Sequence, residues 1–355
     1  HYNGRTGGEE QEKTIRKRRQ IMNIYDIADM AGVSIATVSR VVNGSPNVSE
    51  KTKKKVLDVI EKADYTPNVF ARGLGLDSMK TIGILCPDIS DLYMAEAVSA
   101  LEKKLHEHGY DCILGCSGGE KAAKEYHVQL LLSKRIDALI LVGSTYAEKG
   151  GNCQEADYLR TAAKKVPIFL INGYVEGENI YCFYGDDRQG AYDVTSALIR
   201  RGKQRILFLA DSHTFSAQQK LLGYEQALSE AGYPILGDLK FYTKNEVDYV
   251  KEMLLAHRTL EFDSIFACND LLAVGALKYA KARGIRIPEE LSVTGYNNSA
   301  AALYCEPELT SVDNGVRQLC GNAVENLVKI LQGQQGIGQD NRFACEIVKR
   351  CTTDF

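Results

Sequence analysis

A short helical face that carries one arginine is the first feature of this sequence that could do chemistry. Residues 35–42 read I-A-T-V-S-R-V-V, and helical spacing puts the three valines on one side and the other side chains on the opposite side. The guanidinium of Arg40 can donate two parallel hydrogen bonds to a guanine edge. Ile35 and Ala36 can offer only apolar contact, for example to thymine methyl groups. The outer side of this segment therefore has the chemistry needed to contact bases in DNA.

This face lies in a longer stretch, 24–43, that predicts two short helices joined by a tight turn. Its first half places apolar residues at helical spacing, from Ile24 to Ala31. Gly32 can adopt the positive φ that ends a helix, and Ser34 can cap the next one. A helix pair of this kind is typical of the helix-turn-helix arrangement, whose second helix fits the DNA major groove. On periodicity alone, an ordinary helical hairpin in a core explains the pattern equally well.

The distribution of charge favours the DNA-binding interpretation. The 355 residues carry a formal net charge of -3, which by itself does not suggest a nucleic-acid partner. Residues 16–80, however, contain 12 Lys and Arg against 7 Asp and Glu, a net charge of +5, so the remaining residues carry -8. A basic head on an acidic body is expected when only one part of a protein meets phosphate groups.

The flanks of the helix pair predict a small head and a linker. Ser49 can cap a third helix, Glu50 to Ala63, whose first turns are rich in lysine. The stretch 69–76 is amphipathic but holds two glycines, which lower helix propensity by about 1 kcal/mol each, so we expect a linker that is helical only when something holds it. Residues 1–21 are polar, then basic, and are expected to form a disordered tail; a DNA-contacting arm is the alternative.

From Thr81 onward, strand-sized apolar runs alternate with amphipathic helices in two series. The first series has strands at 82–86, 112–116, 138–142 and 168–171, and the second has strands at 181–184, 206–210, 239–242, 264–268 and 291–295. Late strands are expected at 309–312 and 346–348, with a helix at 317–331 between them. Such alternation predicts parallel doubly wound sheets covered by helices, here as two lobes with a ligand site at the carboxyl ends of the strands.

The same residues resemble a known family. The stretch 24–43, followed by V-S-E-K-T at 48–52 and Y-T-P-N at 65–68, resembles the DNA-binding head of the lactose/galactose repressor family. The body is similar too, for example in P-D-I-S at 87–90, R-I-D-A-L-I at 135–140 and C-N-D at 268–270. The likeness runs from about 23 to 352. It implies an all-α helix-turn-helix head plus an α/β two-lobed effector domain of the periplasmic-binding-protein (type I) kind.

The resemblance implies roles for residues of the head. Base-reading positions of the family fall on Ile35, Ala36 and Arg40. Phosphate-contact positions fall on seven residues with polar side chains: Tyr25, Ser34, Thr37, Ser39, Asn43, Ser49 and Thr52. Such residues position a protein on DNA without reading sequence. The linker matches the family's hinge helix, in which Ala71 and Leu74 fall at minor-groove positions; a leucine wedged there kinks the DNA. Ordinary linker packing is the alternative for Leu74.

Effector-contact positions of the family fall on six residues of the body: Tyr93, Ser144, Ser216, Lys220, Asn269 and Asn297. Lys220 stands where the family usually has Arg, and Asn297 where it usually has Asp. Lysine offers a compact point charge in place of a planar fork, and asparagine replaces an anionic acceptor by an amide. The two departures leave Lys220 without an obvious carboxylate partner. They suggest a ligand with an acidic group, such as a sugar phosphate or sugar acid; a neutral glycoside is the alternative.

We therefore predict a cytoplasmic, nucleoid-associated bacterial transcriptional regulator, most simply a repressor, that binds double-stranded operator DNA as a homodimer. A sugar, sugar phosphate or related metabolite between the lobes would control its operator affinity, by induction or by corepression. The predicted domains are a tail (1–21), a helix-turn-helix domain (22–66), a hinge (67–79) and a two-lobed effector domain (80–355). The predicted lobes are 80–173 plus 310–330, and 174–309 plus 331–355.

Two other functions, a solute-binding receptor and an enzyme, are alternatives that the sequence supports less well. A solute-binding receptor without a DNA role would not need the basic head, and no secretion signal or membrane-spanning run of roughly 18 residues is present. An enzyme is not indicated, because phosphate-loop, dinucleotide-binding and H-E-x-x-H motifs are missing. The 10 cysteines include no C-x-x-C pair and are interpreted as buried thiols. Asp186 and Asp187 are interpreted as helix caps. No catalytic residue, metal site or cofactor is predicted.

Overall fold

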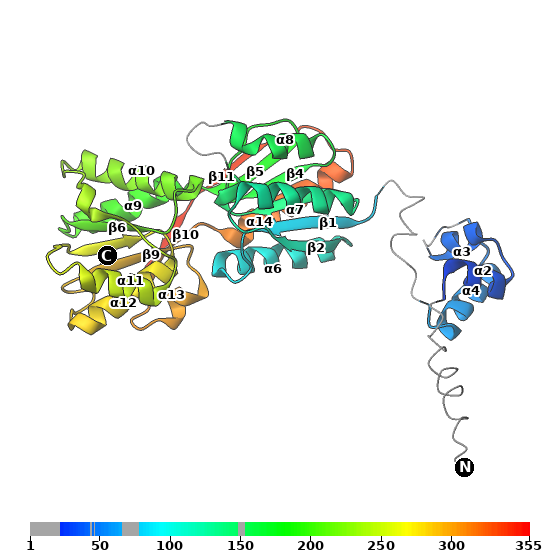
Figure 1. Cartoon of the computed structure of the whole chain (residues 1–355), viewed down its shortest axis with the longest axis horizontal. Helices are drawn as coiled ribbons and strands as arrows, with labels where there is room; N and C mark the ends of the chain where they lie inside the picture. Colours follow the sequence, from blue (N-terminus) through cyan, green and yellow to red (C-terminus); the bar gives the residue numbers. More distant parts are fainter. Residues whose placement is uncertain (1–21, 43–44, 46, 66–77, 148–152) are drawn as a thin grey trace, which may run out of the picture. The chain divides into compact units, whose positions relative to one another are not determined.

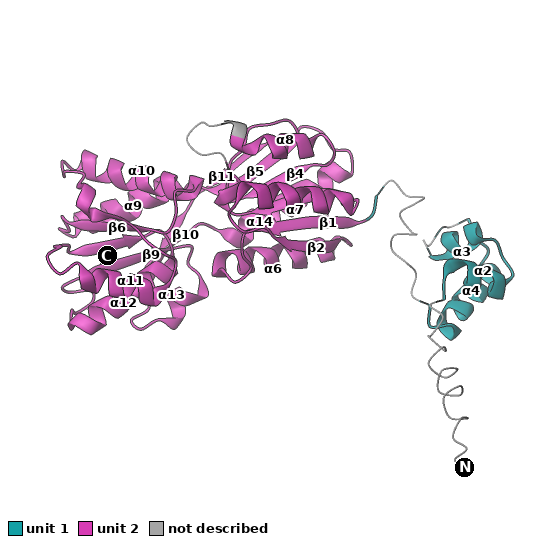
Figure 2. Cartoon of the chain, viewed as in Figure 1, with its two compact units in different colours: residues 1–79 teal, residues 80–355 magenta. Residues whose placement is uncertain are grey.

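The computed structural model of the chain describes residues 22–42, 45, 47–65, 78–147 and 153–355 (Figure 1). The chain divides into two compact units, His1–Met79 and Lys80–Phe355, which Figure 2 colours separately. The predicted tail and most of the predicted hinge lie outside the described residues, and so do Asn43, Ala71 and Leu74. Within the described ranges, no helix combines the length and the hydrophobicity needed to cross a membrane.

The described part of the smaller unit contains three helices, α2 (Ile24–Ala31), α3 (Ile35–Val42) and α4 (Glu50–Lys62). Local chemistry fixes their ends. Asn23 accepts hydrogen bonds from the amides of Tyr25 and Asp26, and the Asp26 carboxylate accepts one from the Asn23 amide, which completes a capping box. Gly32 ends α2 at φ 59°, a left-handed conformation that glycine adopts without strain. The helices share a small apolar core, formed by Ile27, Ala28, Ala31, Val38, Val41 and Val56.

The first lobe of the larger unit is built on a six-stranded sheet with the order β11-β5-β4-β3-β1-β2, in which all pairings are parallel. Its strands are β1 (Thr81–Cys86), β2 (Asp111–Cys116), β3 (Ala138–Val142), β4 (Ile168–Ile171), β5 (Ile180–Gly185) and β11 (Asp340–Phe343). Helices α6 (Leu92–Glu107) and α14 (Val316–Leu331) pack on one face, and α7 (Lys121–Ser133) and α8 (Asp157–Ala163) on the other. Burial of both faces explains why β3 is apolar throughout.

The second lobe repeats this plan with the strand order β12-β10-β9-β8-β6-β7. Its strands are β6 (Ile206–Ala210), β7 (Lys240–Tyr242), β8 (Ser264–Ala267), β9 (Ser292–Tyr296), β10 (Thr310–Asp313) and β12 (Glu346–Val348), and the pair β10/β12 is antiparallel. Helices α9 (Asp187–Arg200) and α10 (Phe215–Glu230) cover one face. Helices α11 (Val247–Ala256), α12 (Asp270–Arg283) and α13 (Ala300–Tyr304) contribute to the other. Short 3-10 helices are η1 (Ser144–Tyr146), η2 (Cys153–Ala156) and η3 (Gly237–Leu239).

The chain passes between the lobes three times, from β5 to α9, from β10 to α14 and from β11 to β12. The three passages meet at Gly185. A Cβ atom on Gly185 would lie 3.0 Å from the Cβ of Asn314 and 3.0 Å from the Sγ of Cys345. Glycine is therefore required there for close packing, and the three connections form one junction behind the space between the lobes.

The predicted lobe boundaries are wrong at three strands. Residues 180–185 pair with β4, so β5 belongs to the first lobe, whereas the prediction placed it in the second lobe with the rest of the segment 174–309. Residues 310–313 pair with β9, so β10 belongs to the second lobe, although α14, which follows it, packs on the first. The strand β11, which was not predicted, joins the first lobe through β5. An apolar run specifies a strand, but its sheet is decided by which neighbour it pairs with.

Candidate DNA-contacting surface and interlobe cleft

Helix α3 presents the outer face that the sequence predicts. Val38 and Val41 are buried, whereas Ala36 and Arg40 are exposed and Ile35 is 40% exposed despite being apolar. Thr37 and Ser39 are half-buried at the margins of this face. An exposed isoleucine and alanine beside an arginine leave an apolar patch next to a planar donor. That combination suits a guanine edge together with a thymine methyl group.

Two matching serine–threonine pairs mark the starts of α3 and α4. The Ser34 hydroxyl accepts a hydrogen bond from the Thr37 amide (3.2 Å), and the two side-chain oxygens are 2.9 Å apart. Ser49 and Thr52 repeat this arrangement at 3.3 Å and 2.9 Å, which confirms both predicted caps. Each pair holds two hydroxyl hydrogens and uses one between its members. One O–H per pair is thus left to donate, next to a helix N-terminus that attracts phosphate.

Other predicted contact residues of the head lie where a nucleic acid could reach them. The Tyr25 side chain is 63% exposed at the start of α2. The exposed lysines Lys51, Lys54 and Lys55 of α4 add positive charge to the unit. Lys53 lies 3.8 Å from the largely exposed Glu50 carboxylate, and an ion pair in such a position contributes little to stability.

All six predicted effector-contact residues line one cavity of about 280 Å³ between the two lobes. The first lobe contributes Tyr93 and Ser144, and the second contributes Ser216, Lys220, Asn269 and Asn297. The loops and helices that carry them follow the carboxyl ends of parallel strands, which is where such sheets bind ligands. Further polar lining residues, which the sequence did not single out, are Asp91, Thr145, Asn172, Asp211, Ser212 and Thr214.

Lys220 is 4% exposed and is already engaged by the protein. Its Nζ donates a hydrogen bond to the Cys268 carbonyl (3.0 Å) and lies 3.8 Å from the centre of the Tyr296 ring. No ion pair joins Lys220 to a carboxylate among the described residues, but its charge acts on the buried carboxyl of Asp187. Burial raises the pKa of Asp187 above its ordinary value, and Lys220 opposes that rise.

Asp186 and Asp187 have different roles, although they are neighbours in the sequence. Asp186 caps α9 as predicted, through its carboxylate and the amide of Gln189 (3.2 Å). Asp187 is 3% exposed and accepts a hydrogen bond from the hydroxyl of Ser216. Its position in the first turn of α9, directly after the junction at Gly185, turns it inward. No pattern in the sequence distinguishes the inward carboxylate from the capping one.

Asn269 and Asn297 are held by partners of the second lobe. Asn269 caps α12 by accepting from the Leu272 amide (3.0 Å) and donates from Nδ2 to Asp211 (3.0 Å). Asn297 has φ 87°, a region that asparagine enters more readily than most residues. Its Oδ1 accepts from Nδ2 of Asn314 (3.4 Å). The second-lobe wall is therefore formed by side chains whose orientation the protein itself fixes.

The first-lobe wall is different. The hydroxyl of Tyr93, a side chain only 6% exposed, makes no hydrogen bond of normal geometry among the described residues, although the Asn314 side chain lies close enough to act on its pKa, and the buried Oδ1 of Asn172 has no partner there. Burial also raises the pKa of Tyr93 well above its ordinary value, so the hydroxyl keeps its proton. An unmet buried polar group costs about 1–3 kcal/mol. A ligand with hydroxyl groups could satisfy both atoms, since a hydroxyl both donates and accepts.

The described residues contain no group of three or more His, Cys, Asp and Glu side chains that could hold a metal ion. Residues 115–119 formally match G-x-S-x-G, a motif that presents a nucleophilic serine in some hydrolases. Here the hydroxyl of buried Ser117 is hydrogen-bonded to Tyr146 Oη (2.6 Å) and to the Gly118 carbonyl (3.0 Å). Its described partners include no histidine that could act as a base.

Comparisons with known proteins agree with this architecture. Residues 23–68 match the family described as bacterial regulatory proteins, lacI family, and residues 195–353 match the periplasmic binding protein-like domain. An HTH-type transcriptional regulator of Lachnoclostridium phytofermentans is 47% identical over 336 residues, which cover 94% of this chain and 100% of the relative.

Two solved structures are similar over nearly the whole chain. The Lac repressor dimer bound to operator and the anti-inducer ONPF is 25% identical with a TM-score of 0.83, covering 94% of this chain and 99% of its own. The complex of the transcriptional regulator CelR with cellobiose is 25% identical with a TM-score of 0.67, covering 93% and 99%.

A helix-turn-helix head joined to a two-lobed, ligand-binding body defines a ligand-controlled DNA-binding protein. The chain belongs to the lacI family of bacterial regulatory proteins, and it is a transcriptional regulator with an effector-binding domain. The predicted fold class and the resemblance are thereby confirmed. The relatives are transcriptional regulators and not enzymes.

Proposed function

We propose that this regulator is a repressor that acts on DNA in the bacterial cytoplasm and binds a near-palindromic operator as a homodimer, with one head on each half-site. The exposed outer face of α3 carries this proposal. Arg40 reads a guanine, and Ile35 and Ala36 contact thymine methyl groups. Tyr25, Ser39 and the two serine–threonine pairs hold the phosphates on either side. Asn43, Ala71 and Leu74 keep their proposed DNA roles, although they lie outside the described residues.

We further propose that the effector is a neutral carbohydrate. Tyr93 offers a hydroxyl and Asn172 an acceptor to the cavity, and both are unmet. Lys220 is engaged by the Cys268 carbonyl and the Tyr296 ring and does not require an anionic ligand. The carboxylates of Asp91 and Asp211 also line the cavity and would repel one. These features favour a neutral glycoside over the sugar phosphate or sugar acid that the sequence suggested. The cellobiose bound by CelR is a ligand of this kind.

Effector binding and DNA binding are linked through the lobes. A ligand that contacts both walls stabilises one relative orientation of the lobes, and so changes how two subunits hold their heads one helical turn apart. Each ligand changes the affinity for the other by the same factor. The sign, induction or corepression, depends on which orientation suits the operator.

Selection of bound sequences from a random DNA library by the full-length protein tests the DNA role. We expect enrichment of a near-palindrome with half-sites one helical turn apart. Arg40→Ala should cost roughly 1–3 kcal/mol of discrimination at one base pair, whereas Lys54→Ala should weaken binding to all sequences alike. An enriched site that Arg40→Ala binds with unchanged preference contradicts the assignment of α3 as the recognition helix.

Calorimetry with cellobiose, glucose and glucose 6-phosphate tests the effector class. Binding of a neutral sugar, weakened about tenfold or more by Tyr93→Phe, is the expected result. Binding of glucose 6-phosphate alone, lost on Lys220→Ala, contradicts the neutral ligand and supports the acidic one.

A further inference from the structure

A second cavity, of about 390 Å³, lies between the lobes and is separate from the effector cleft. Its lining comes from both lobes: Tyr174, Tyr184, Gly185, Asp340 and Arg342 from the first, and Asp186, Asp187, Arg188, Phe215 and Gln219 from the second. This volume lies in the range of small-molecule sites. The site proposed above does not use it.

Helix α10 separates the two cavities. Ser216 and Lys220, one turn apart, face the effector cleft, whereas Phe215 and Gln219, also one turn apart, face the second cavity. Neighbouring positions on a helix point about 100° apart, so the two stripes serve different spaces. The loop after β4 divides in the same way, with Asn172 lining the cleft and Tyr174 the second cavity. The two cavities are thus adjacent compartments with a shared wall.

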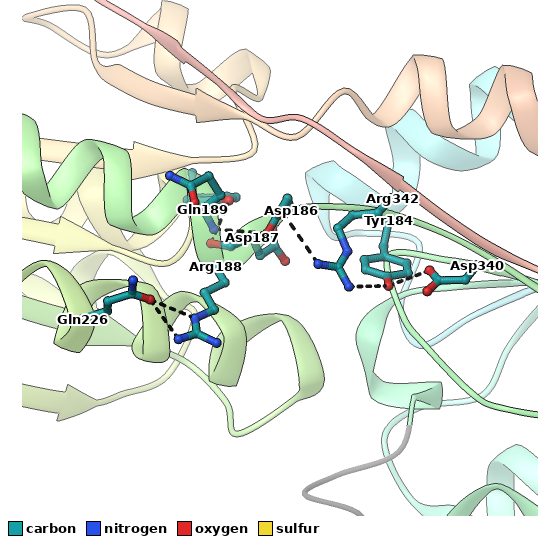
Figure 3. Close-up of polar contacts among 9 residues, drawn as sticks. Tyr184, Asp186, Asp187, Arg188, Gln189, Gln226, Asp340 and Arg342 are labelled. Carbon is teal, nitrogen blue, oxygen red and sulfur yellow. Dashed lines mark hydrogen bonds and ion pairs between the residues drawn. The ribbon is translucent and has the colours of Figure 1, made fainter.

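The charged groups of the second cavity are held in place by hydrogen bonds and an ion pair (Figure 3). Tyr184 donates its hydroxyl hydrogen to Asp340 (2.7 Å) and accepts one hydrogen bond from Arg342 (3.4 Å). Arg342 also lies 3.8 Å from the Asp186 carboxylate, an ion pair that joins the two lobes. Arg188 donates two hydrogen bonds to the Gln226 side chain, at 3.1 Å and 2.8 Å. Two guanidiniums and three carboxylates therefore border the cavity in fixed positions.

Three aromatic rings form a wall beside these charges. The rings of Tyr174 and Tyr184 meet edge to face with centroids 6.1 Å apart, and those of Tyr184 and Phe215 do so at 5.8 Å. The second pair again joins one lobe to the other. An aromatic wall next to fixed donors and acceptors suits a flat molecule with an apolar face and a polar rim.

Asp187 connects the second cavity to a residue of the effector cleft. It lines the second cavity, while its carboxylate accepts the hydroxyl of Ser216 in the effector cleft. Its other oxygen, Oδ1, is buried and has no hydrogen-bond partner among the described residues. A buried carboxylate oxygen without a partner is costly, and a small movement of its neighbours would let a donor from either compartment reach it.

These features select the chemistry of an occupant. The guanidiniums offer donors and the carboxylates offer acceptors, and the charges nearly balance. A ligand must therefore donate and accept at several points without carrying a net charge of its own, which is what a set of hydroxyl groups does. The aromatic wall adds a surface for a C–H face. A neutral monosaccharide or similar polyol satisfies all these requirements at once.

We propose that this cavity is a second small-molecule site, which binds a neutral polyhydroxylated ligand the size of a monosaccharide across the two lobes. Because the site touches both lobes and its Asp187 accepts a hydrogen bond from Ser216 of the cleft, its ligand modulates the response to the effector. This regulatory part rests on the proposed function, whereas binding itself does not.

Saturation-transfer NMR on the full-length protein tests the site, with D-glucose, D-galactose, D-xylose and D-mannitol at millimolar concentration as probes. Gln219→Phe fills the cavity from α10, and Gln218→Phe adds the same ring at the next position of the helix, outside both linings. Asn269→Ala alters the effector cleft alone. We expect at least one probe to bind the wild type, Gln218→Phe and Asn269→Ala alike, and to bind Gln219→Phe about tenfold more weakly or not at all.

Three results would overturn the second site: no probe binds, Gln219→Phe binds like Gln218→Phe when both also carry Asn269→Ala to weaken the cleft, or Asn269→Ala alone abolishes binding. Displacement of a bound probe by glucose 6-phosphate, lost in Gln219→Phe, would show that the occupant is charged and that the neutral class is wrong. A mobility shift on the selected operator then measures regulation, and the probe should change operator affinity in the wild type but not in Gln219→Phe. A wild type that binds probe but no operator contradicts the proposed function and leaves the second site supported.

Discussion

The two walls of the effector cleft are prepared for a ligand in opposite ways. On the second lobe, Lys220, Asn269 and Asn297 all have partners within the protein. On the first lobe, the Tyr93 hydroxyl and the Asn172 carbonyl oxygen are buried without partners in the described residues. The second lobe therefore supplies a preorganised surface. The first lobe supplies buried polar atoms that are unfavourable in the free protein and that a ligand can satisfy with hydrogen bonds. Binding energy in this cleft is expected to come mainly from the first lobe, on a framework set by the second.

Removing the carboxylate below the second-lobe wall should have the largest effect. Asp187→Ala leaves the buried hydroxyl of Ser216 without its acceptor. An unmet buried polar group costs about 1–3 kcal/mol, and we expect the upper part of that range because the missing side chain leaves a cavity as well. Urea unfolding of the full-length protein measures the loss. Asp186→Ala, which removes a cap, is the matched control and should cost about 1 kcal/mol. Equal losses would contradict an inward, functional Asp187.

The same carboxylate should make stability depend on pH. Burial raises the folded-state pKa of Asp187 above the ordinary value of 3.8, so the folded state holds this proton more tightly than the unfolded chain. The free energy of unfolding should then fall as the pH rises from about 4 towards the raised value, by at most about 1.4 kcal/mol per pH unit, and level off above it. Urea midpoints across this range check the trend. Burial also raises the pKa values of Asp270 and Asp91, which act in the same direction, so Asp187→Asn should make the slope shallower without abolishing it. An unchanged slope in Asp187→Asn refutes the assignment.

On the first-lobe wall, removal of a polar group should raise the free energy of unfolding of the ligand-free protein and weaken ligand binding. Tyr93→Phe deletes a buried hydroxyl that makes no hydrogen bond of normal geometry and only a weak contact with the Asn314 side chain, and we expect the free energy of unfolding of the ligand-free protein to rise by at most about 1 kcal/mol. Affinity for the effector should fall about tenfold. Calorimetric unfolding and ligand titration measure the two quantities on one variant. A loss of stability together with unchanged ligand affinity would mean that Tyr93 belongs to the core and not to the site.

A substitution at the rim of the second-lobe wall should have the smallest effect on the free energy of unfolding, and it should lower that free energy where Tyr93→Phe raises it. Asn269→Ala removes the cap of α12 and should lower the free energy of unfolding by somewhat less than 1 kcal/mol, at the lower end of the roughly 0.5–2 kcal/mol that a lost cap costs. Asn269→Asp keeps the cap but places a second carboxylate beside Asp211, so it should retain stability at low pH and lose ligand affinity. Thermal unfolding and titration of the pair separate the capping role from the ligand role. If both variants bind ligand like the wild type, Asn269 serves only α12.

The local elements could be predicted from the sequence because their signals are local. The apolar spacing of 24–31, the glycine at 32 and the serines at 34 and 49 each act within one turn of a helix, and the structure confirms them. Strand-sized apolar runs predicted the sheets for the same reason, since buried parallel strands are apolar on both faces. The six effector-contact positions came from the family resemblance, and they do line one cavity.

Other features depend on which distant segments meet. Nothing in residues 310–313 states that they pair with β9, so the lobe to which β10 belongs could not be predicted. Asp187 and Asn172 gain their importance from neighbours far away in the chain, namely Lys220 and the opposite lobe. The second cavity joins α10 to residues 340 and 342 of an unpredicted strand.

The sequence by itself thus determined the helix-turn-helix head, the two α/β lobes and the chemical types of the residues at the cleft. Only the tertiary structure decided which of those polar groups are satisfied and which are left unmet. The physical reason is that helix caps and apolar periodicity are set within a few residues, whereas the cost of a buried polar atom depends on every group that folding brings within hydrogen-bond distance of it.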